Sequence, residues 1–193
     1  IATGKSTVAN LLRDLGASVI DADALTHELQ RQGTPTYAAI VDAFGAAILN
    51  KTGEIDRRAL GSIVFAEPGS LKQLEEIIHP AIAIESQRRI IEAPAPIVVY
   101  EAIKLIEAGR ASMCDALWVV TAKVEVQLER LMRDRKMTEA EARTRIEAQP
   151  PQSEKLKWAT VVIDNSESIE ATRQQVVTAY KAIKLSTAFP RRL

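Results

Sequence analysis

The residues with the clearest chemistry stand at the beginning of the chain, in the stretch TGKST. Gly4, Lys5 and Ser6 supply the last three letters of the phosphate-binding pattern G-x-x-x-x-G-K-[ST]. In such a loop the glycine lets backbone N–H groups face an anion, the lysine reaches the β- and γ-phosphates, and the hydroxyl coordinates Mg²⁺. The alternative is a helix N-terminus that carries these three residues by chance. The amphipathic helical pattern that follows favours the phosphate-binding interpretation.

Carboxylates end two of the apolar stretches. Asp21 ends SVID and is followed closely by Asp23, while Glu101 ends VVYE. Ligands of open α/β sheets bind beyond the carboxyl ends of the strands, where a carboxylate can accept a proton from a hydroxyl nucleophile or help to hold Mg²⁺. The alternative for each acid is a solvated loop residue or a helix N-cap. Because the N-cap alternative fits Asp23 better, Asp21 is the stronger candidate for function.

Basic residues are concentrated in ERLMRDRKMTEAEARTRIEAQ, before the last predicted strand. Arginines on a mobile flap could close over a triphosphate and neutralise the charge that develops during phosphoryl transfer. We assign Arg133 and Arg135, near a turn between two helices, to such a lid. The alternative is a solvated helix with Glu–Arg pairs, which suits Arg143 and Arg145.

Other motifs are less informative when taken alone. Arg58 in DRRAL has the pattern of a surface charge, and His79 in IIHPAI that of a structural histidine at a helix end. The segment TAKVE at Thr121–Glu125 does not supply the N-K-x-D signature that a guanine-binding GTPase would need.

The elements that must position these residues alternate along the chain. Four short apolar runs are predicted to be strands that are buried on both faces: Ala17–Asp21, Pro96–Glu101, Ala116–Thr121 and Val161–Asp164. Between them lie predicted helices: Lys5–Leu15, Ala22–Arg31, Arg57–Phe65, Leu71–Ile78, Ile82–Ile91, Val124–Arg133, Glu139–Ala148 and Ile169–Ile183. Thr138 and Glu141 form a predicted capping box. This alternation indicates a doubly wound α/β fold with a parallel sheet.

The middle of the chain, residues 33–94, holds helical patterns and no convincing strand. We predict that it is a helical insertion into a core made of residues 1–32 and 95–193. A phosphate-binding loop also needs a strand that leads into it. We therefore expect a β-strand and the first glycine of the loop to precede Ile1 in the natural protein.

Composition narrows the range of partners. The chain has 193 residues, in which 25 Lys and Arg balance 25 Asp and Glu, so a basic excess typical of nucleic-acid binding is absent. Cys114 is the only cysteine, which fits a reducing cytosol. No apolar run approaches the roughly 20 residues that span a bilayer. We expect a cytoplasmic protein with neither nucleic acid nor membrane as partner, and the sequence does not indicate its oligomeric state.

Taken together, these segments resemble the dephospho-CoA kinase family over essentially the whole chain. The matching segments stand in the family's order: GKSTVANLLRDLGASVIDADALTHEL, DRRALGSIVF, LKQLEEIIHPAI, EAGRASMCDALWVVTAK, QLERLM, RTRIEAQ and VVIDNSESIEATRQQV. The VIDAD step soon after the loop helix, combined with IIHP, is more specific than the loop alone. The resemblance implies a three-layer P-loop kinase fold with a five-stranded parallel sheet, a helical substrate-binding domain and a lid at about residues 133–150.

The resemblance also implies a reaction, in which ATP with Mg²⁺ phosphorylates the ribose 3′-hydroxyl of dephospho-CoA to give CoA and ADP. By matching position, Asp21 is the catalytic base, Lys5 steadies the transferring phosphoryl group and Ser6 holds the metal. The implied ATP-binding residues are Ala2, Thr3, Gly4, Lys5, Ser6, Thr7, Arg133, Arg135 and Asn165, the last of them near adenine. The implied residues on the dephospho-CoA side are Asp21, Arg58, His79, Glu101 and Lys104.

The chain departs from the family pattern at two further places. Ile103–Leu105 reads IKL instead of Pro-Leu-Leu, which places Lys104 near the substrate cleft. Asp134 stands where a lid arginine is expected, with Arg133 and Arg135 on either side, which shifts the expected clamp by one residue. Two alternative functions remain: another small-molecule P-loop kinase, for example of a nucleoside or of shikimate, and a nucleotide-binding module without transfer activity.

Overall fold

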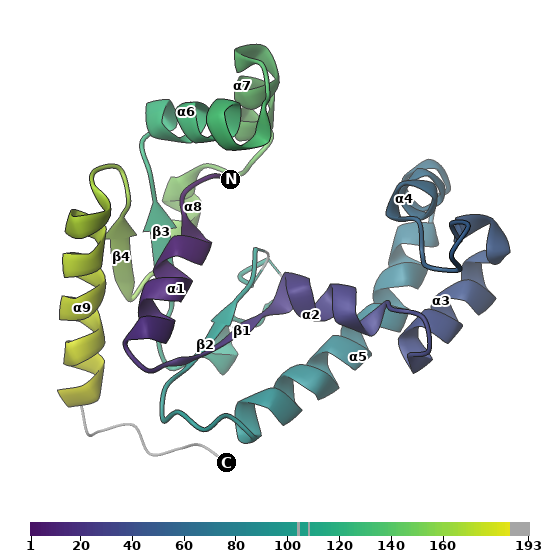
Figure 1. Cartoon of the computed structure of the whole chain (residues 1–193), viewed down its shortest axis with the longest axis horizontal. Coiled ribbons are helices and arrows are strands. Elements are labelled where there is room, and N and C mark those ends of the chain that lie inside the picture. Colours follow the sequence, from purple (N-terminus) through teal and green to yellow (C-terminus); the bar gives the residue numbers. More distant parts are fainter. Residues whose placement is uncertain (104, 108, 186–193) are drawn as a thin grey trace. The chain divides into compact units, whose positions relative to one another are not determined.

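The computed structural model describes residues 1–103, 105–107 and 109–185 (Figure 1). The chain divides into two compact units. The first contains Ile1–Val19 together with the chain from Ile103 onward, and the second contains Ile20–Ala102. No helix among the described residues is both long enough and apolar enough to cross a membrane.

Strands and helices alternate along the chain, as the sequence predicts. The strands are β1 (Ser18–Asp21), β2 (Val98–Glu101), β3 (Trp118–Thr121) and β4 (Val161–Asp164). The helices are α1 (Lys5–Asp14), α2 (Ala22–Leu29), α3 (Pro35–Phe44), α4 (Arg57–Ala66), α5 (Ser70–Ile91), α6 (Val124–Arg135), α7 (Glu139–Glu147), α8 (Gln152–Leu156) and α9 (Ile169–Leu185), with 3₁₀ turns η1 (Ala46–Ile48) and η2 (Ala111–Met113). All four predicted strands are confirmed, whereas α3 and α8 are missing from the predicted helices.

The described strands pair as β1 with β2 and as β3 with β4. β3 and β4 are parallel, with Trp118 opposite Val161 and Thr121 opposite Asp164. The expectation that every strand is covered on both faces is wrong for β4. Ile163 is buried, but its neighbour Val162 is 48% exposed. Successive side chains of a strand point to opposite faces, and α9 packs against β4, so within the described part of the chain the face that carries Val162 is left partly exposed.

The first unit is built around α1 and α9, which lie side by side (Figure 1). Spacing of three and four residues places Val8, Leu11 and Leu12 on one buried face of α1. Helices α6 and α7 pack separately on each other through Leu131 and Ala142. The predicted capping box at the start of α7 is confirmed, since Thr138 and Glu141 bond each other's backbone N–H groups.

The second unit carries a helical core. Its buried side chains come from α2, α3, η1, α4 and α5: Leu25, Ile40, Ile48, Leu60, Val64, Ile78 and Ile82. Between residues 33 and 94 the described chain forms helices and one isolated bridge, Leu49 with Ile55. The assignment of residues 33–94 as an insertion that binds the substrate stays a prediction.

Two of the predicted helices are wrong as separate elements, because both belong to α5. Leu71–Ile78 and Ile82–Ile91 are halves of one 22-residue helix that runs through Pro80. A proline inside a helix removes one backbone hydrogen bond and bends the axis, which is why the sequence predicts a break there. Burial of Ile78 and Ile82, on either side of Pro80, compensates for this cost through tertiary packing. His79 therefore lies within the helix, with its side chain exposed, and not at a helix end.

Candidate active site

The loop before α1 has the backbone geometry of an anion-binding turn. Gly4 precedes the helix with φ of 88°, and Ala2 has φ of 54°, so both residues are left-handed. No side chain caps the first turn of α1. The N–H groups of Thr3, Gly4 and Lys5 donate to no described residue, so they are available to a ligand, and the helix dipole favours an anion there.

Two side chains from elements distant in the sequence donate hydrogen bonds to the carbonyl groups of the loop. Asn165, directly after β4, donates from Nδ2 to the carbonyl oxygen of Thr3 at 2.9 Å. Arg130 of α6 donates from Nη1 to the carbonyl of Ala2 at 3.3 Å and from Nη2 to that of Asn165 at 2.8 Å. Thr172 of α9 in turn donates to Oδ1 of Asn165 at 2.8 Å. The loop is thus tied to β4, α6 and α9.

Gly4 has no room for a side chain. A methyl group there would lie 1.9 Å from Nδ2 of Asn165, and the left-handed φ adds a cost of about 1–2 kcal/mol for any L-residue. We expect Gly4→Ala to displace the loop and to weaken ATP binding by about tenfold or more, as measured by calorimetric titration. Gly16→Ala is the matched control, because Gly16 is also left-handed (φ 95°) but has open space around it. Equal ATP affinities of the two variants would contradict this prediction.

A cavity of about 340 Å³ opens beside the loop in the first unit. Its lining residues come from the loop, from α6 and from the segment after β4: Ala2, Gly4, Thr7, Arg130, Leu131, Arg133, Asp134, Arg135, Asn165, Glu167 and Ile169. Six of the nine residues predicted to bind ATP are among them. The other three, Thr3, Lys5 and Ser6, belong to the loop and the first turn of α1 without lining the cavity. The arrangement suits a phosphorylated ligand whose phosphates lie on the loop.

The two arginines that are predicted to form the lid differ in their surroundings. Arg133 is held by its neighbour, since Nε lies 2.7 Å and Nη2 3.1 Å from the two carboxylate oxygens of Asp134, and Glu129 is 3.6 Å away. Arg135 makes no ion pair with any described residue, and it lines the cavity. The Arg133 guanidinium lowers the pKa of the Asp134 carboxyl, so this pair stays charged and mutually neutralised. Of the two predicted residues, Arg135 therefore has the cation available for an incoming phosphate.

The residues at the start of α1 have the chemistry that binding of ATP and Mg²⁺ would need. Lys5 forms no ion pair with any described residue, so its charge is available to a phosphate, and Ser6 presents an exposed side chain one position further along α1. Mg²⁺ prefers oxygen ligands and is commonly held by one or two protein oxygens together with substrate phosphates. The N–H groups of Thr3 and Gly4, the hydroxyl of Ser6 and the ammonium of Lys5 fit a magnesium–nucleotide complex.

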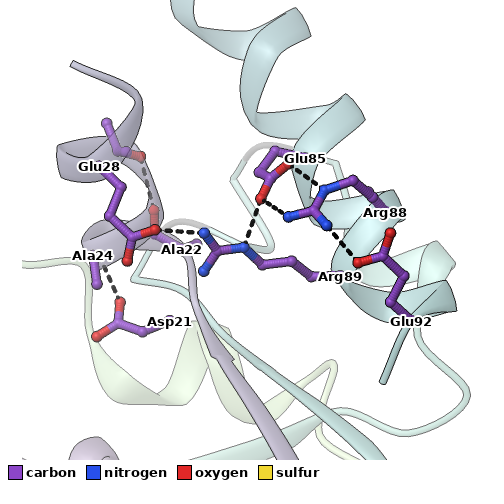
Figure 2. Close-up of polar contacts among 9 residues, drawn as sticks. Asp21, Ala22, Ala24, Glu28, Glu85, Arg88, Arg89 and Glu92 are labelled. Atoms are coloured by element: carbon purple, nitrogen blue, oxygen red, sulfur yellow. Dashed lines mark hydrogen bonds and ion pairs between the residues drawn. The ribbon is translucent and has the colours of Figure 1, made fainter. Parts of the chain in front are cut away.

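Asp21 ends β1 and begins α2. Its Oδ1 accepts hydrogen bonds from the N–H groups of Asp23 at 2.9 Å and Ala24 at 3.0 Å, the second of which is drawn in Figure 2. The expectation that Asp23 is the better N-cap is therefore wrong. β1 keeps extended angles through Asp21 and the helix starts at Ala22, so the capping position falls on Asp21. Its Oδ2 accepts no bond from a described residue, and the side chain is exposed.

A network of charged side chains joins α2 to α5 in the second unit (Figure 2). Arg89 bonds Glu28 of α2 and, from Nε, Glu85 at 2.8 Å. Arg88 donates twice to Glu85, at 2.8 and 2.6 Å, and also bonds Glu92. Because Asp21 caps α2, this network helps to fix the helix on which the candidate base stands.

The network predicts a loss of stability in acid. Hydrogen bonds from Arg88 and then Arg89 lower the pKa of Glu85 to about 2. The unfolded chain has a higher value, about 4.3, so the stabilisation is complete above that pH and is lost as the pH falls towards 2. We expect Glu85→Gln to cost on the order of 1 kcal/mol near neutral pH and to flatten the acid limb of the stability profile.

Thermal unfolding between neutral pH and about pH 2.5 measures this effect. Glu92→Gln is the control, because it removes the partner of Arg88 on the solvent side, where Glu92 is 58% exposed. An unchanged acid limb in Glu85→Gln would show that the network does not contribute.

The remaining residues predicted on the substrate side are only partly described. Arg58 in the first turn of α4 and His79 in α5 are exposed, and their side chains make no hydrogen bond or ion pair with a described residue. Glu101 ends β2 and is half-buried. Lys104 lies outside the described residues. No hydrogen bond or ion pair joins Arg58, His79 and Glu101 to one another, so their grouping around a substrate stays a prediction.

The α/β core with parallel strands, together with an uncapped Gly-Lys-Ser loop at the start of α1, defines a P-loop kinase. The family model described as dephospho-CoA kinase matches residues 1–171, and the chain belongs to this family. A dephospho-CoA kinase from Geobacter metallireducens is 50% identical over 184 residues, which cover 94% of this chain and 92% of the relative. One from Symbiobacterium thermophilum is 43% identical over 94% of this chain and 77% of its own length.

Solved structures agree with the family. The TT1252 protein from Thermus thermophilus superposes with a TM-score of 0.81 at 33% identity, over 98% of this chain and 94% of that one. The dephospho-CoA kinase from Campylobacter jejuni gives a TM-score of 0.68 at 28% identity, over 96% and 94%. The chain is thus a kinase of the last step of coenzyme A biosynthesis.

Proposed function

We propose that Lys5, Ser6 and Asp21 carry out the transfer of the γ-phosphoryl group of ATP to the ribose 3′-hydroxyl of dephospho-CoA, with Mg²⁺. The observation that supports this most is the loop at Ala2–Gly4, whose geometry and free N–H groups suit a triphosphate. In the proposed complex these N–H groups bind the phosphates, and the Lys5 ammonium lies against the transferring group.

The Asp21 carboxylate accepts the proton of the 3′-hydroxyl as the new oxygen–phosphorus bond forms. The bond from the γ-phosphorus to the bridging oxygen breaks, and ADP leaves with that electron pair. Oδ2 is the proposed acceptor, because Oδ1 already accepts the two N–H groups of α2. Mg²⁺, when bound to Ser6 and the phosphates, supplies additional stabilisation of negative charge. Arg135 is the proposed lid residue that closes on the phosphates.

The acceptor hydroxyl must displace water for the reaction to give CoA instead of hydrolysing ATP. Arg58, His79, Glu101 and Lys104 are the proposed contacts of dephospho-CoA. A lid that includes Arg135 would exclude water once both substrates are bound.

An assay of ADP release with different acceptors tests the function. Dephospho-CoA is expected to support turnover, and adenosine, AMP and shikimate are not. Mass spectrometry of the product should show one added phosphoryl group on dephospho-CoA. Turnover with one of the other acceptors would indicate a different small-molecule kinase, and ATP binding without turnover on any acceptor would indicate a nucleotide-binding module.

A further inference from the structure

We infer that Asn165 and Arg130 are positioning residues, which aim the N–H groups of the phosphate loop by holding its carbonyl groups. The inference rests on the proposed function of the loop as the site of the phosphates. It gives Asn165 a different role from the predicted contact with adenine, and it gives Arg130 a role that the lid pattern did not single out.

The geometry of the peptide bond provides the first step. In a planar trans peptide the carbonyl oxygen of one residue and the N–H of the next point in opposite directions. Arg130 holds the carbonyl of Ala2 and Asn165 holds that of Thr3. The N–H groups of Thr3 and Gly4 are therefore turned away from these two side chains. Neither N–H group donates to a described residue, although Thr3 is only 8% exposed.

Asn165 is built into the protein as a rigid support. It is 3% exposed, its backbone N–H bonds Thr121 of β3 at 2.9 Å, and both ends of its amide are used. Nδ2 donates to Thr3 and Oδ1 accepts from Thr172. Since Oδ1 already has a partner and the amide lies against Gly4, the side chain is committed to the loop and leaves little for recognition of a base.

Arg130 adds a charge to this support. It is half-buried, it has no carboxylate partner among the described residues, and its guanidinium donates to two carbonyl groups. Carbonyl acceptors carry no full negative charge, so they do not neutralise the guanidinium, and Arg130 also lines the cavity beside the loop. The same residue thus fixes the loop and contributes positive potential where phosphates would lie.

A competition experiment separates this role from adenine recognition. Inorganic tripolyphosphate carries the phosphates without the base, and adenosine carries the base without the phosphates. For Asn165→Leu, a neutral variant of similar volume, we expect the inhibition constant of tripolyphosphate to rise about tenfold or more while that of adenosine is unchanged. KM for ATP should rise in parallel, and KM for dephospho-CoA should not change.

Gln175→Met is the matched control. Gln175 of α9 bonds both the N–H and the carbonyl of Asp164 at the end of the same strand, at 2.9 and 2.8 Å, but it does not touch the loop. This variant should lose stability without a change in the tripolyphosphate constant. Should Asn165→Leu fail to fold, Thr172→Val, which removes the hydroxyl that supports Oδ1 and leaves the Asn165 amide in place, is expected to shift the tripolyphosphate constant in the same direction by a few-fold.

Three results would overturn the inference. An increase confined to adenosine would show that Asn165 reads the base, and equal constants in wild type and variants would show that the loop does not depend on it. Failure of the wild-type protein to bind tripolyphosphate would remove the phosphate site itself. The proposed function fails separately, if wild type binds tripolyphosphate but does not phosphorylate dephospho-CoA.

Discussion

Replacement of Asp21 by asparagine is expected to lower kcat by about 10²–10⁴-fold, the usual contribution of a general base. Asparagine cannot accept the proton of the attacking hydroxyl. The affinity for ATP should be unchanged, because a base acts in the transition state more than in the binding of either substrate. Steady-state kinetics with dephospho-CoA and calorimetric titration with ATP measure the two effects independently.

The capping role of Asp21 makes asparagine the right substitution. Asp21 caps α2 through Oδ1, and asparagine is an equally good N-cap, so Asp21→Asn keeps the helix start and its stability. Asp21→Ala would lose the cap as well, at a cost of about 1 kcal/mol. Asp23→Asn is the control, since it neutralises the next carboxylate of the same helix turn. Full activity of Asp21→Asn would mean that another group accepts the proton.

Removal of the Lys5 ammonium by Lys5→Met should lower kcat by about 10²–10³-fold, comparable to the loss of one preorganised donor in other active sites. The reason is that Lys5 has no ion-pair partner among the described residues, so in the apo protein its charge is not neutralised by a carboxylate. A cation in that state needs no rearrangement to stabilise charge on the transferring phosphoryl group.

Arg13→Met is the matched control for Lys5→Met. It removes a cation from the last turn of the same helix, where the Arg13 guanidinium donates to the side chain of Asn10 and forms no ion pair with a described residue. Its kcat should equal that of the wild type, as measured by ADP release with dephospho-CoA at saturating ATP. An equal decrease in both variants would indicate damage to α1 and not the loss of a catalytic charge.

Local patterns predicted the strands and most of the helices, because alternation and periodicity are visible within a few residues. The predicted helices do not include α3, although Thr34 is a good N-cap residue and Pro35 a favoured first helical residue. In the structure the Thr34 hydroxyl accepts a hydrogen bond from the N–H of Tyr37. The break predicted at Pro80 was wrong because the packing of Ile78 and Ile82 depends on distant residues of the second unit. Propensity is overridden there by tertiary contacts.

In the candidate site, too, the contiguous motif could be predicted from the sequence and the contacts between distant residues could not. Gly4, Lys5 and Ser6 are contiguous, so their pattern is readable from the sequence. The bond from Asn165 to Thr3 joins residues 162 positions apart, and that from Arg130 to Ala2 spans 128. No spacing rule connects such pairs, so neither bond could be predicted. For Arg130 the sequence showed only that it lies in a basic stretch. The capping role of Asp21 was readable from the predicted boundaries, because the predicted strand ends at Asp21 and the next predicted helix begins at Ala22, which puts Asp21 at the N-cap position.

The unbroken course of α5 has a mechanical consequence for the second unit. A helix of 22 residues is roughly 33 Å long, and α3 and α4 both pack on it. Towards its C-terminal end, Ser86 bonds Tyr100 of β2 at 3.0 Å and Arg89 bonds Glu28 of α2. The helix therefore connects α3 and α4 rigidly to β2 and α2, and Pro80 is the position in it where one backbone hydrogen bond is missing. A displacement of α4 would therefore be passed through α5 to β2, which ends at Glu101, and to α2, which Asp21 caps.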